Sequence, residues 1–439
     1  MPGRHAGRSG AAAARRLVYG AHRRGAPRAG AVALAAVLVL MGGCAFRRLR
    51  EDLERLQTFG VLGGAVSREP EDDGPIVVAL CTGTGPDVVD TFILDRPGSY
   101  FFTAPAGTYR LAAFVDRNRD LAYEPGEPAA WYGAPTDVAV GGGRTIGHLD
   151  IHIGSPGVRL DVPISVGNPG RRRAPEMPPM HVGELVTLDD PRFTDANGKR
   201  GLWQPVDFLF DVGAGIYFLE PFDAKKTPVL FVHGAGGHPG NWRYLVEHLD
   251  RTKFQPWLAY YPSGLALPLT ARGMARWTRA AATHYGVKHV IIVAHSMGGL
   301  VSRAAINEIT THGDGTLLSL FVTLSTPWNG HPAAARGVEQ APVVIPTWPD
   351  LVPDSPFLVG LYATSLPPGC PYYLLFSYNG RSMFLREPND GVVPVASELP
   401  MRAQAAAVRM YGFDESHVGI LGSEEASRTL NALLAAAVR

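Results

Sequence analysis

Cysteine and net charge are both scarce in this sequence. Its 439 residues include three cysteines, and the formal charge is +1. A disulfide between Cys81 and Cys370 and two buried free thiols are equally compatible with this pattern. Residues 1–43 carry seven arginines and no acidic residue, which leaves 34 basic and 40 acidic residues in the rest of the chain. We therefore expect no nucleic-acid partner, because sequence-independent binding to phosphates requires a basic surface.

An apolar run long enough to cross a membrane is missing as well. Residues 29–44, "AGAVALAAVLVLMGGC", follow a basic start and are shorter than the about 20 apolar residues that a transmembrane helix needs. This pattern is typical of an export signal covering residues 1–43. Met41-Gly42-Gly43-Cys44 resembles the lipobox of bacterial lipoproteins. The resemblance implies lipidation of Cys44 and membrane attachment in the cell envelope, on the periplasmic face or in the outer membrane. An uncleaved signal anchor is the alternative.

Residues 44–75 are expected to form a tether between the lipidated end and the body of the protein. Apolar residues recur at helical spacing in its first half, and a Gly/Pro/Asp-rich linker follows. A short amphipathic helix lying on the membrane or docked on the body fits the same pattern. The apolar positions are Leu49, Leu53, Leu56 and Phe59.

Short strand patterns separated by Gly and Pro fill residues 76–165, which predicts a small all-β sandwich domain. The stretch "PAGTYRLAAFVDRNRDLAYEPGEP" resembles the carboxypeptidase-regulatory-like or immunoglobulin-like modules of exported proteins. Residues 166–226 are interpreted as a connector, and the alternation in residues 202–223 predicts a leading strand pair. No internal repeat is present.

One loop of the predicted sandwich has oxygen-bearing residues at the spacing of a calcium loop. Asp116, Asn118, Asp120 and Glu127 occupy positions 1, 3, 5 and 12. Leu121 stands where an EF-hand loop has its turn-forming glycine, and no flanking helices are evident. The alternative to a structural calcium site is a hairpin loop rich in Asx turns, with solvated carboxylates.

From residue 227 to residue 439 strand patterns alternate with helix patterns. Alternation of this kind requires crossover connections and predicts a mostly parallel sheet flanked by helices, which is an α/β architecture. The third strand pattern, "HVIIVAHS", ends at Ser296 and passes directly into a helix pattern. A strand, a tight turn with serine at its apex and a helix form the nucleophile elbow of α/β-hydrolases. The turn requires small residues on both sides, and Ala294 and Gly298 satisfy this requirement.

A serine nucleophile needs a base, and in this fold the base is a histidine near the C-terminus. Three histidines follow Ser296, at positions 312, 331 and 417. Only His417 follows the last strand pattern, so we predict that it accepts the serine proton and returns it to the leaving group.

The acid that orients this histidine is expected after the penultimate strand, "YYLLFSYNG". Asp390, in "NDGVVPVAS", occupies that position, with Glu387 as the nearest competitor. Asp350 and Asp354 lie in a variable insert, and Asp414 lies on the loop of the histidine itself.

Acyl transfer also needs backbone N–H groups directed at the developing oxyanion. We predict that Met297, directly after the nucleophile, supplies one and Ala235 in "FVHGAGG" the other, with Gly236 as the second choice. His233 and His295 are interpreted as structural residues that shape the pocket.

Residues 227–435 resemble the α/β-hydrolase superfamily, in particular bacterial lipases and esterases. The segments that carry the resemblance are "VLFVHGAGG", "VAHSMGGLVSR", "STPWNG" and "NDGVVPVAS". The resemblance implies a serine hydrolase that cleaves small-molecule or lipid esters through an acyl-enzyme and needs no cofactor. Alternatives are an acyltransferase with the same three residues and a non-catalytic envelope scaffold with a hydrolase-like domain.

Residues 328–370 form an insert rich in Pro, Val, Leu and Trp. Enzymes of this kind place a lid over the acyl site here, and an apolar lid favours acyl chains and excludes water. The alternative is a surface excursion whose apolar residues pack on the core. Under the lid interpretation, the acyl pocket is lined by Trp328, Trp348, Phe357 and Leu361.

Overall fold

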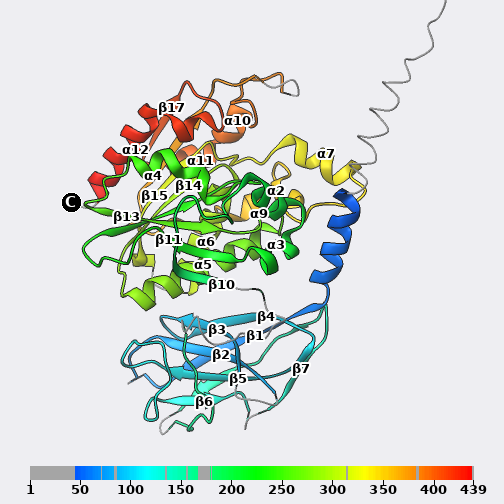
Figure 1. The fold of residues 1–439 in the computed structure, drawn as a ribbon, viewed down its shortest axis with the longest axis vertical. Coiled ribbons are helices and arrows are strands. Elements are labelled where there is room, and N and C mark those ends of the chain that lie inside the picture. Colours follow the sequence, from blue (N-terminus) through cyan, green and yellow to red (C-terminus); the bar gives the residue numbers. More distant parts are fainter. Residues whose placement is uncertain are drawn as a thin grey trace, which may run out of the picture. The chain divides into compact units, whose positions relative to one another are not determined.

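The computed structural model describes residues 45–437, except for 71, 84–86, 134–135, 155–156, 167–177, 179, 313–314 and 382–384. The expected signal segment and Cys44 lie outside the described residues. In the described part of the chain, no helix has the length and apolar character needed to span a membrane. Figure 1 shows an all-β part followed by a part in which helices surround a sheet.

Two sheets form the all-β part: in the first, β1 pairs antiparallel with β4 and parallel with β8 and β9, and the second is antiparallel throughout. One has the order β4-β1-β8 with β9 also pairing β1, and the other has the order β3-β2-β5-β6 with β7 also pairing β5. Alternate residues of both sheets face a shared apolar core that includes Leu62, Val78, Phe102 and Leu111. The strands are β1 (Phe59–Arg68), β2 (Ile76–Thr82), β3 (Val88–Leu94), β4 (Gly98–Pro105), β5 (Gly107–Val115), β6 (Ala129–Trp131), β7 (Val138–Val140), β8 (Thr145–Ile146) and β9 (Ile151–Ile153).

The expected boundary of the tether is wrong. Residues 46–56 are helical, as the leucine spacing predicts, but β1 lies inside the range assigned to a linker. β1 pairs with β4 along eight residues, from Phe59 opposite Pro105 to Val66 opposite Gly98. The glycines of β1 suggested a flexible linker, but Leu62 and Val66 are buried and supply the apolar face of the strand.

The expected leading strand pair is wrong too. Its first half is helical, because Thr194 caps α2 (Asp195–Trp203) by accepting from the Asn197 N–H and Pro205 opens α3 (Pro205–Asp211). Only β11 (Ala214–Phe218) is a strand there. Its partner is β10 (Met180–Leu185), which comes from the region interpreted as a connector and runs parallel to β11.

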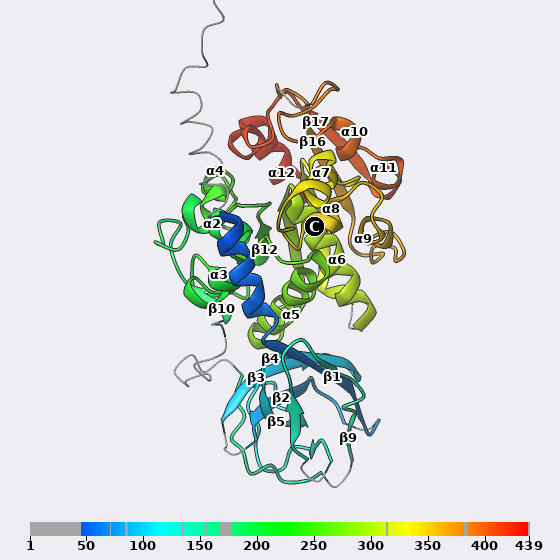
Figure 2. The same cartoon turned by 90° about the vertical axis from the view of Figure 1, so that its right-hand side faces the viewer.

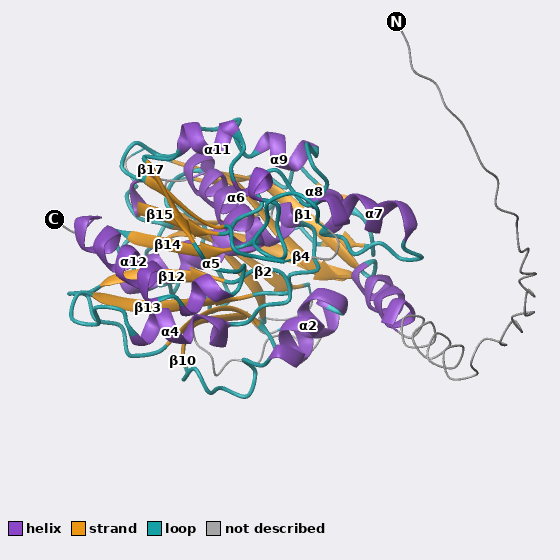
Figure 3. Ribbon diagram, turned by 90° about the horizontal axis from the view of Figure 1, so that it is seen from above, coloured by secondary structure: helices purple, strands orange, loops and turns teal. Residues whose placement is uncertain are grey.

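A mostly parallel eight-stranded sheet, of order β10-β11-β13-β12-β14-β15-β16-β17, forms the centre of the C-terminal part in the described residues (Figure 3). The one antiparallel pairing joins β11 to β13. Its central strands are buried apolar runs, as expected for a parallel sheet covered on both faces. The remaining strands are β12 (Thr227–Val232), β13 (Phe254–Tyr260), β14 (Val290–His295), β15 (Leu318–Leu324), β16 (Tyr372–Ser377) and β17 (Arg409–Phe413).

Helices cover both faces of this sheet (Figure 2). The long helices α5 and α6 pack against each other, whereas α4 and α12 both contact the 3-10 turn η3. Parallel strands bring the loops at their C-terminal ends to one edge, where a site can be assembled. The helices and turns are η1 (Pro239–Trp242), α4 (Arg243–Glu247), α5 (Leu267–Tyr285), α6 (Met297–His312), η2 (Gly315–Leu317), α7 (Pro332–Gln340), α8 (Trp348–Leu351), α9 (Pro356–Gly360), α10 (Val395–Glu398), α11 (Met401–Ala406), η3 (Gly419–Gly422) and α12 (Glu424–Ala437).

The loop with calcium spacing closes on its own backbone. The Asp116 carboxylate accepts from the N–H groups of Asp120 and Leu121, and Glu127 accepts from those of Arg117 and Glu124. No group of three or more His, Cys, Asp or Glu side chains among the described residues is placed to hold a metal ion. These side chains thus accept from the backbone as in Asx turns, and calcium binding by Asp116, Asn118, Asp120 and Glu127 stays a prediction.

Both remaining cysteines are free and buried. Cys81 lies in β2, and Cys370 lies just before β16. Burial raises the pKa of each thiol to about 12, so neither is a reactive thiolate at neutral pH.

A buried aspartate from the N-terminal helical residues caps α3. The Asp52 side chain is 2% exposed and accepts from the N–H groups of Val206 (2.9 Å) and Asp207 (2.6 Å). The local N-cap residue of this helix, Gln204, makes no side-chain capping hydrogen bond of its own. The orphan N–H groups of the first turn thus find a partner about 150 residues away.

Asp52→Ala is expected to destabilise the protein by about 1–3 kcal/mol, because buried N–H groups lose a charged acceptor. Urea unfolding at pH 7 measures the effect. Glu54→Ala, on an exposed position of the same helical segment, is the matched control. Equal stability of the two variants would contradict the capping role.

Candidate active site

Ser296 sits at the sharp turn between β14 and α6. Its backbone is in the left-handed region, with φ of 54°, and its N–H donates to the Leu324 carbonyl of the neighbouring strand β15 at 2.8 Å. A Cβ on Gly298 would lie 2.4 Å from the carbonyl oxygens of Val232 and His233, and one on Gly234 would lie 2.7 Å from the Ser296 Cβ. The turn at Ser296 therefore fits only because Gly234 and Gly298 lack side chains. This agrees with the nucleophile elbow predicted from the sequence.

The structure brings Ser296, His417 and Asp390 together. His417 Nε2 lies 2.9 Å from Ser296 Oγ, and His417 Nδ1 lies 2.5 Å from Asp390 Oδ2. The carboxylate can only accept, so Nδ1 carries a proton and Nε2 is free to accept the serine proton. The three residues are separated by up to 121 positions in sequence. Each of their side chains is buried, with at most 9% of the residue exposed.

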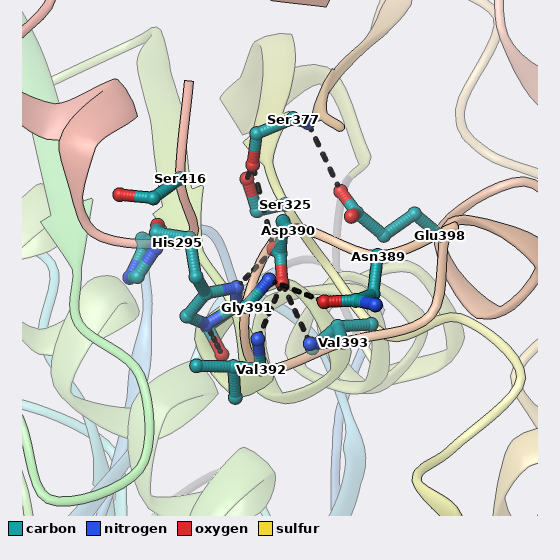
Figure 4. Close-up of polar contacts among 12 residues, drawn as sticks. His295, Ser325, Ser377, Asn389, Asp390, Gly391, Val392, Val393, Glu398 and Ser416 are labelled. Atoms are coloured by element: carbon teal, nitrogen blue, oxygen red, sulfur yellow. Dashed lines mark hydrogen bonds and ion pairs between the residues drawn. The ribbon is translucent and has the colours of Figure 1, made fainter. Parts of the chain in front are cut away.

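Asp390 is held by its own loop as well as by His417. Its Oδ1 accepts from the N–H groups of Val392 (2.9 Å) and Val393 (2.6 Å), as Figure 4 shows. Burial raises the pKa of this carboxyl, but the hydrogen bond and charge of His417 and the two backbone N–H groups outweigh burial and lower it overall. Asp390 is therefore ionised at neutral pH. Its competitor Glu387 is exposed and has no side-chain contact with His417.

The loop that carries His417 is fixed from two sides. The His417 N–H donates to the Asp390 carbonyl at 2.8 Å, and His295 Nε2–H donates to the His417 carbonyl at 2.8 Å. Burial lowers the pKa of His295 to about 3, so its imidazole is neutral. His295 thus has the structural position predicted from the sequence, directly beside the histidine that contacts Ser296.

The loop after β12 approaches Ser296 through Gly234. Here Gly236 donates its N–H to Ser263 Oγ at 2.9 Å, which removes it from the donors available to an oxyanion. The Ala235 N–H makes no hydrogen bond within the described residues, and Ala235 is exposed. Met297 is the first residue of α6, where helix N–H groups lack intrahelical partners. This geometry favours Ala235 over Gly236.

His233, at the start of the same loop, is held by Tyr261. It stacks on Tyr261 with ring centroids 4.2 Å apart, and its carbonyl accepts from the Tyr261 hydroxyl at 2.5 Å. Burial lowers the pKa of His233 to about 3. A neutral, stacked imidazole of this kind has a structural role, as the sequence predicts.

The insert between β15 and β16 folds into α7, α8 and α9 and is tied to the site loops. Asp350 accepts from the Leu267 N–H at the start of α5 (2.7 Å), and His331 Nε2–H donates to the Val392 carbonyl beside Asp390 (2.6 Å). Thr347 contacts the sulfur of Met297, next to Ser296. The insert is therefore in direct contact with Met297, which follows the nucleophile, and with the loop of Asp390.

Two of the four predicted pocket residues are core residues. Trp328 is 1% exposed and contacts the rings of Phe321, Tyr362 and Tyr372, and Leu361 is 2% exposed. Their place in an apolar insert predicts a pocket, but Trp328 packs on β15 and β16, and Leu361 is held by the Asn307 side chain of α6, which donates to its carbonyl at 3.0 Å.

Trp348 and Phe357 are half-buried. Trp348 contacts Trp203 of α2 edge-on, with ring centroids 6.2 Å apart. A cavity of about 180 Å³ beside Phe210, Leu269 and Trp277 is lined by none of the four predicted pocket residues.

Sequence reasoning missed the residues behind Asp390. Ser377, at the end of β16, donates from Oγ to Asp390 Oδ2 at 3.4 Å and also contacts Ser325 Oγ at 2.5 Å. Glu398 is fully buried and accepts from the Ser377 N–H at 3.4 Å. Only the proximity of Glu398 to "NDGVVP" in the sequence could have pointed to it, because exposed acids are equally common at such positions.

Comparisons with known proteins concern the C-terminal part of the chain. Residues 229–428 match the family model described as "Alpha/beta hydrolase family". The Schizosaccharomyces pombe protein named "Putative lipase C4A8.10" is 29% identical over 136 residues, which cover 27% of this chain and 17% of that protein. The match thus spans less than a fifth of the length of this curated relative.

Solved structures that are similar include two lipases. Bacillus licheniformis lipase BlEst2 in its mature form is 16% identical with a TM-score of 0.40, and the match covers 50% of this chain and 97% of that chain. Aspergillus fumigatus lipase B is 16% identical with a TM-score of 0.39, and the match covers 50% of this chain and 56% of that chain.

The neutral state of His295 predicts a pH dependence of stability. An unfolded histidine takes up a proton as the pH falls below 6.5, whereas native His295 stays neutral down to about 3. The stability contributed by this group is therefore complete above pH 6.5 and is lost as the pH falls, by up to about 1.4 kcal/mol per unit. His295→Gln keeps the donor to His417 and should lose about 2 kcal/mol less than the wild type between pH 7 and pH 5.

Urea unfolding at the two pH values measures this difference. The exposed His289→Gln variant serves as control and should follow the wild type. Identical pH dependence in His295→Gln and the wild type would contradict the prediction. It would show that His295 takes up its proton in the same pH range in the native and in the unfolded protein.

Proposed function

Residues 229–428 have the α/β-hydrolase fold, and we propose that they form a serine hydrolase that cleaves carboxylic esters. The observation that carries the proposal is the continuous hydrogen-bond chain from Ser296 Oγ through His417 to the buried, ionised Asp390. A serine hydroxyl becomes a useful nucleophile only with a base within hydrogen-bond reach and an acid that orients the base. Both conditions are met on loops at one edge of the sheet.

In the proposed reaction, Ser296 Oγ attacks the ester carbonyl while His417 Nε2 takes its proton. The Asp390 carboxylate keeps the imidazole in the required tautomer and stabilises the imidazolium. The N–H groups of Ala235 and Met297 are proposed to receive the oxyanion of the tetrahedral intermediate. His417 then protonates the leaving alcohol, and water releases the acid from Ser296 by the reverse proton transfers.

We propose that the acyl part of the substrate ester is apolar. Val392, two residues after Asp390, is 47% exposed, and Val418, directly after His417, is 62% exposed. Exposed apolar side chains next to both partners of the nucleophile support an ester that brings apolar surface to the site. The apolar insert in contact with Met297 supports the same class. Lipidation at Cys44 would place this site at an envelope membrane, and this remains part of the proposal.

Ser296→Ala is expected to abolish hydrolysis of p-nitrophenyl esters, with a loss of at least about 10⁴-fold in kcat/KM. The full chain in mild detergent is assayed with short and long acyl esters, and labelling by a fluorophosphonate is measured in parallel. Ser99→Ala, an exposed serine in the all-β part, is the control. A wild type that neither hydrolyses esters nor reacts at Ser296 would overturn the proposal, whereas labelling without turnover would overturn only the substrate class.

Gly234→Ala tests the close approach of the β12 loop. The added methyl would lie 2.7 Å from the Ser296 Cβ, so the loop or the serine must shift. We expect kcat/KM to fall by about 100-fold, because displacements near 1 Å have effects of this size. Gly369→Ala, where the methyl meets no atom within 4 Å, is the matched control. Wild-type rates in Gly234→Ala would contradict the role of this loop.

A further inference from the structure

A second carboxyl group lies behind Asp390 and has no part in the reaction described above. Glu398, the last residue of α10, is 0% exposed. Its Oε2 accepts from the Ser377 N–H at 3.4 Å, whereas its Oε1 has no hydrogen-bond partner among the described residues. Figure 4 shows Glu398 beside Ser377, on the side of Asp390 away from Val392 and Val393.

Ser377 links the two buried carboxyl groups. Its N–H donates to Glu398 Oε2 at 3.4 Å, and its Oγ donates to Asp390 Oδ2 at 3.4 Å. In the described part of the chain, Asp390 pairs with no cation other than His417, and Glu398 pairs with none. Two ionised carboxylates in one buried site would repel each other, and this repulsion favours a proton on one of them.

The surroundings determine which carboxyl holds that proton. Asp390 accepts from His417 and from two backbone N–H groups, all of which stabilise its anion. Glu398 accepts from one backbone N–H. Burial, and then the charge of Asp390, raise the pKa of Glu398 to about 10. The proton therefore resides on Glu398, and Asp390 is the anion.

We propose that Glu398 is a positioning residue: its protonated carboxyl group donates a hydrogen bond to Asp390 and holds that carboxylate ionised and aligned with His417. The inference rests on the proposed hydrolase function. The orphan oxygen supports it, because an Oε1–H group directed at Asp390 would account for a buried polar atom that otherwise lacks a partner. The group acts through Asp390 and does not touch the substrate.

Two substitutions test whether Glu398 acts as a neutral hydrogen-bond donor, as an ionised carboxylate or only by filling space. Glu398→Gln has the shape of the protonated acid and keeps an N–H donor for Asp390, together with an acceptor for the Ser377 N–H. Glu398→Met keeps the volume but has no N–H or O–H donor. Glu387→Gln, an exposed position three residues before Asp390, is the control for removing an acid from this segment.

We expect Glu398→Gln to keep kcat/KM for a p-nitrophenyl ester within about threefold of the wild type. Glu398→Met should lower kcat by about tenfold or more with KM unchanged within about twofold, because a misaligned orienting acid affects the transition state and not binding. The acid limb of the pH profile of kcat should also move to higher pH in Glu398→Met. Loss of a donor to the Asp390 anion raises the pKa of Asp390, so protonation of Asp390 begins earlier as the pH falls.

A stability measurement tests the proton on Glu398 without any substrate. An unfolded glutamate ionises near pH 4.5, whereas native Glu398 keeps its proton up to about pH 10. Stability from this group is complete below pH 4.5 and declines as the pH rises toward 10. Between pH 5 and pH 9, the unfolding constant of the wild type should therefore rise relative to that of Glu398→Gln, by up to about tenfold per pH unit.

Three results would overturn the inference. The first is a Glu398→Gln variant that loses as much kcat as Glu398→Met, since this would require an ionised glutamate. The second is a Glu398→Met variant with wild-type kcat and pH profile, and the third is a pH-independent ratio of the two unfolding constants. Failure of the hydrolase proposal is distinguishable, because wild-type enzyme would then neither hydrolyse esters nor label at Ser296, while the unfolding ratio would still report the state of Glu398.

Discussion

The left-handed backbone at Ser296 is the constraint on which the rest of the site depends. A non-glycine residue at φ of 54° is strained, and this strain persists only where surrounding contacts fix it. The hydrogen bond to the Leu324 carbonyl and the close approach of the β12 loop at Gly234 and Gly298 supply those contacts. The serine hydroxyl thereby stands clear of the strand it follows, within reach of a histidine on a distant loop.

Charge in this site is limited by burial. Among the described residues of the site Asp390 is the one anion, and it is surrounded by donors: His417, two backbone N–H groups and Ser377. His295 contacts the loop of His417, His233 stacks on Tyr261, and burial keeps both imidazoles neutral, with pKa values near 3. A site with a single ionised group lets His417 gain a proton during turnover without competing cations nearby. Protonation of Glu398 completes this arrangement.

The insert and the site loops form one network. His331 binds the Val392 carbonyl next to Asp390, Asp350 binds the start of α5, and Thr347 contacts Met297. Two of these contacts reach residues near the nucleophile or its orienting acid: Met297 follows Ser296, and Val392 lies two residues after Asp390. A substrate that displaces α8 or α9 would therefore act on the loops that hold the reacting groups, which links recognition of an acyl chain to the geometry of the site.

Pattern in the sequence was enough to select Ser296, His417 and Asp390, which the structure brings together, because strand-turn-helix context and order along the chain are local or sequential properties. The sequence also determined the helix-strand alternation, since buried parallel strands are apolar throughout. Only the tertiary structure decided that β1 completes a sheet, that Trp328 and Leu361 pack inward, and that residues 202–211 are mostly helical. These outcomes depend on which surfaces meet. Glu398 is the clearest case: its sequence neighbourhood resembles that of any exposed acid, and burial against Asp390 gives it a different protonation state.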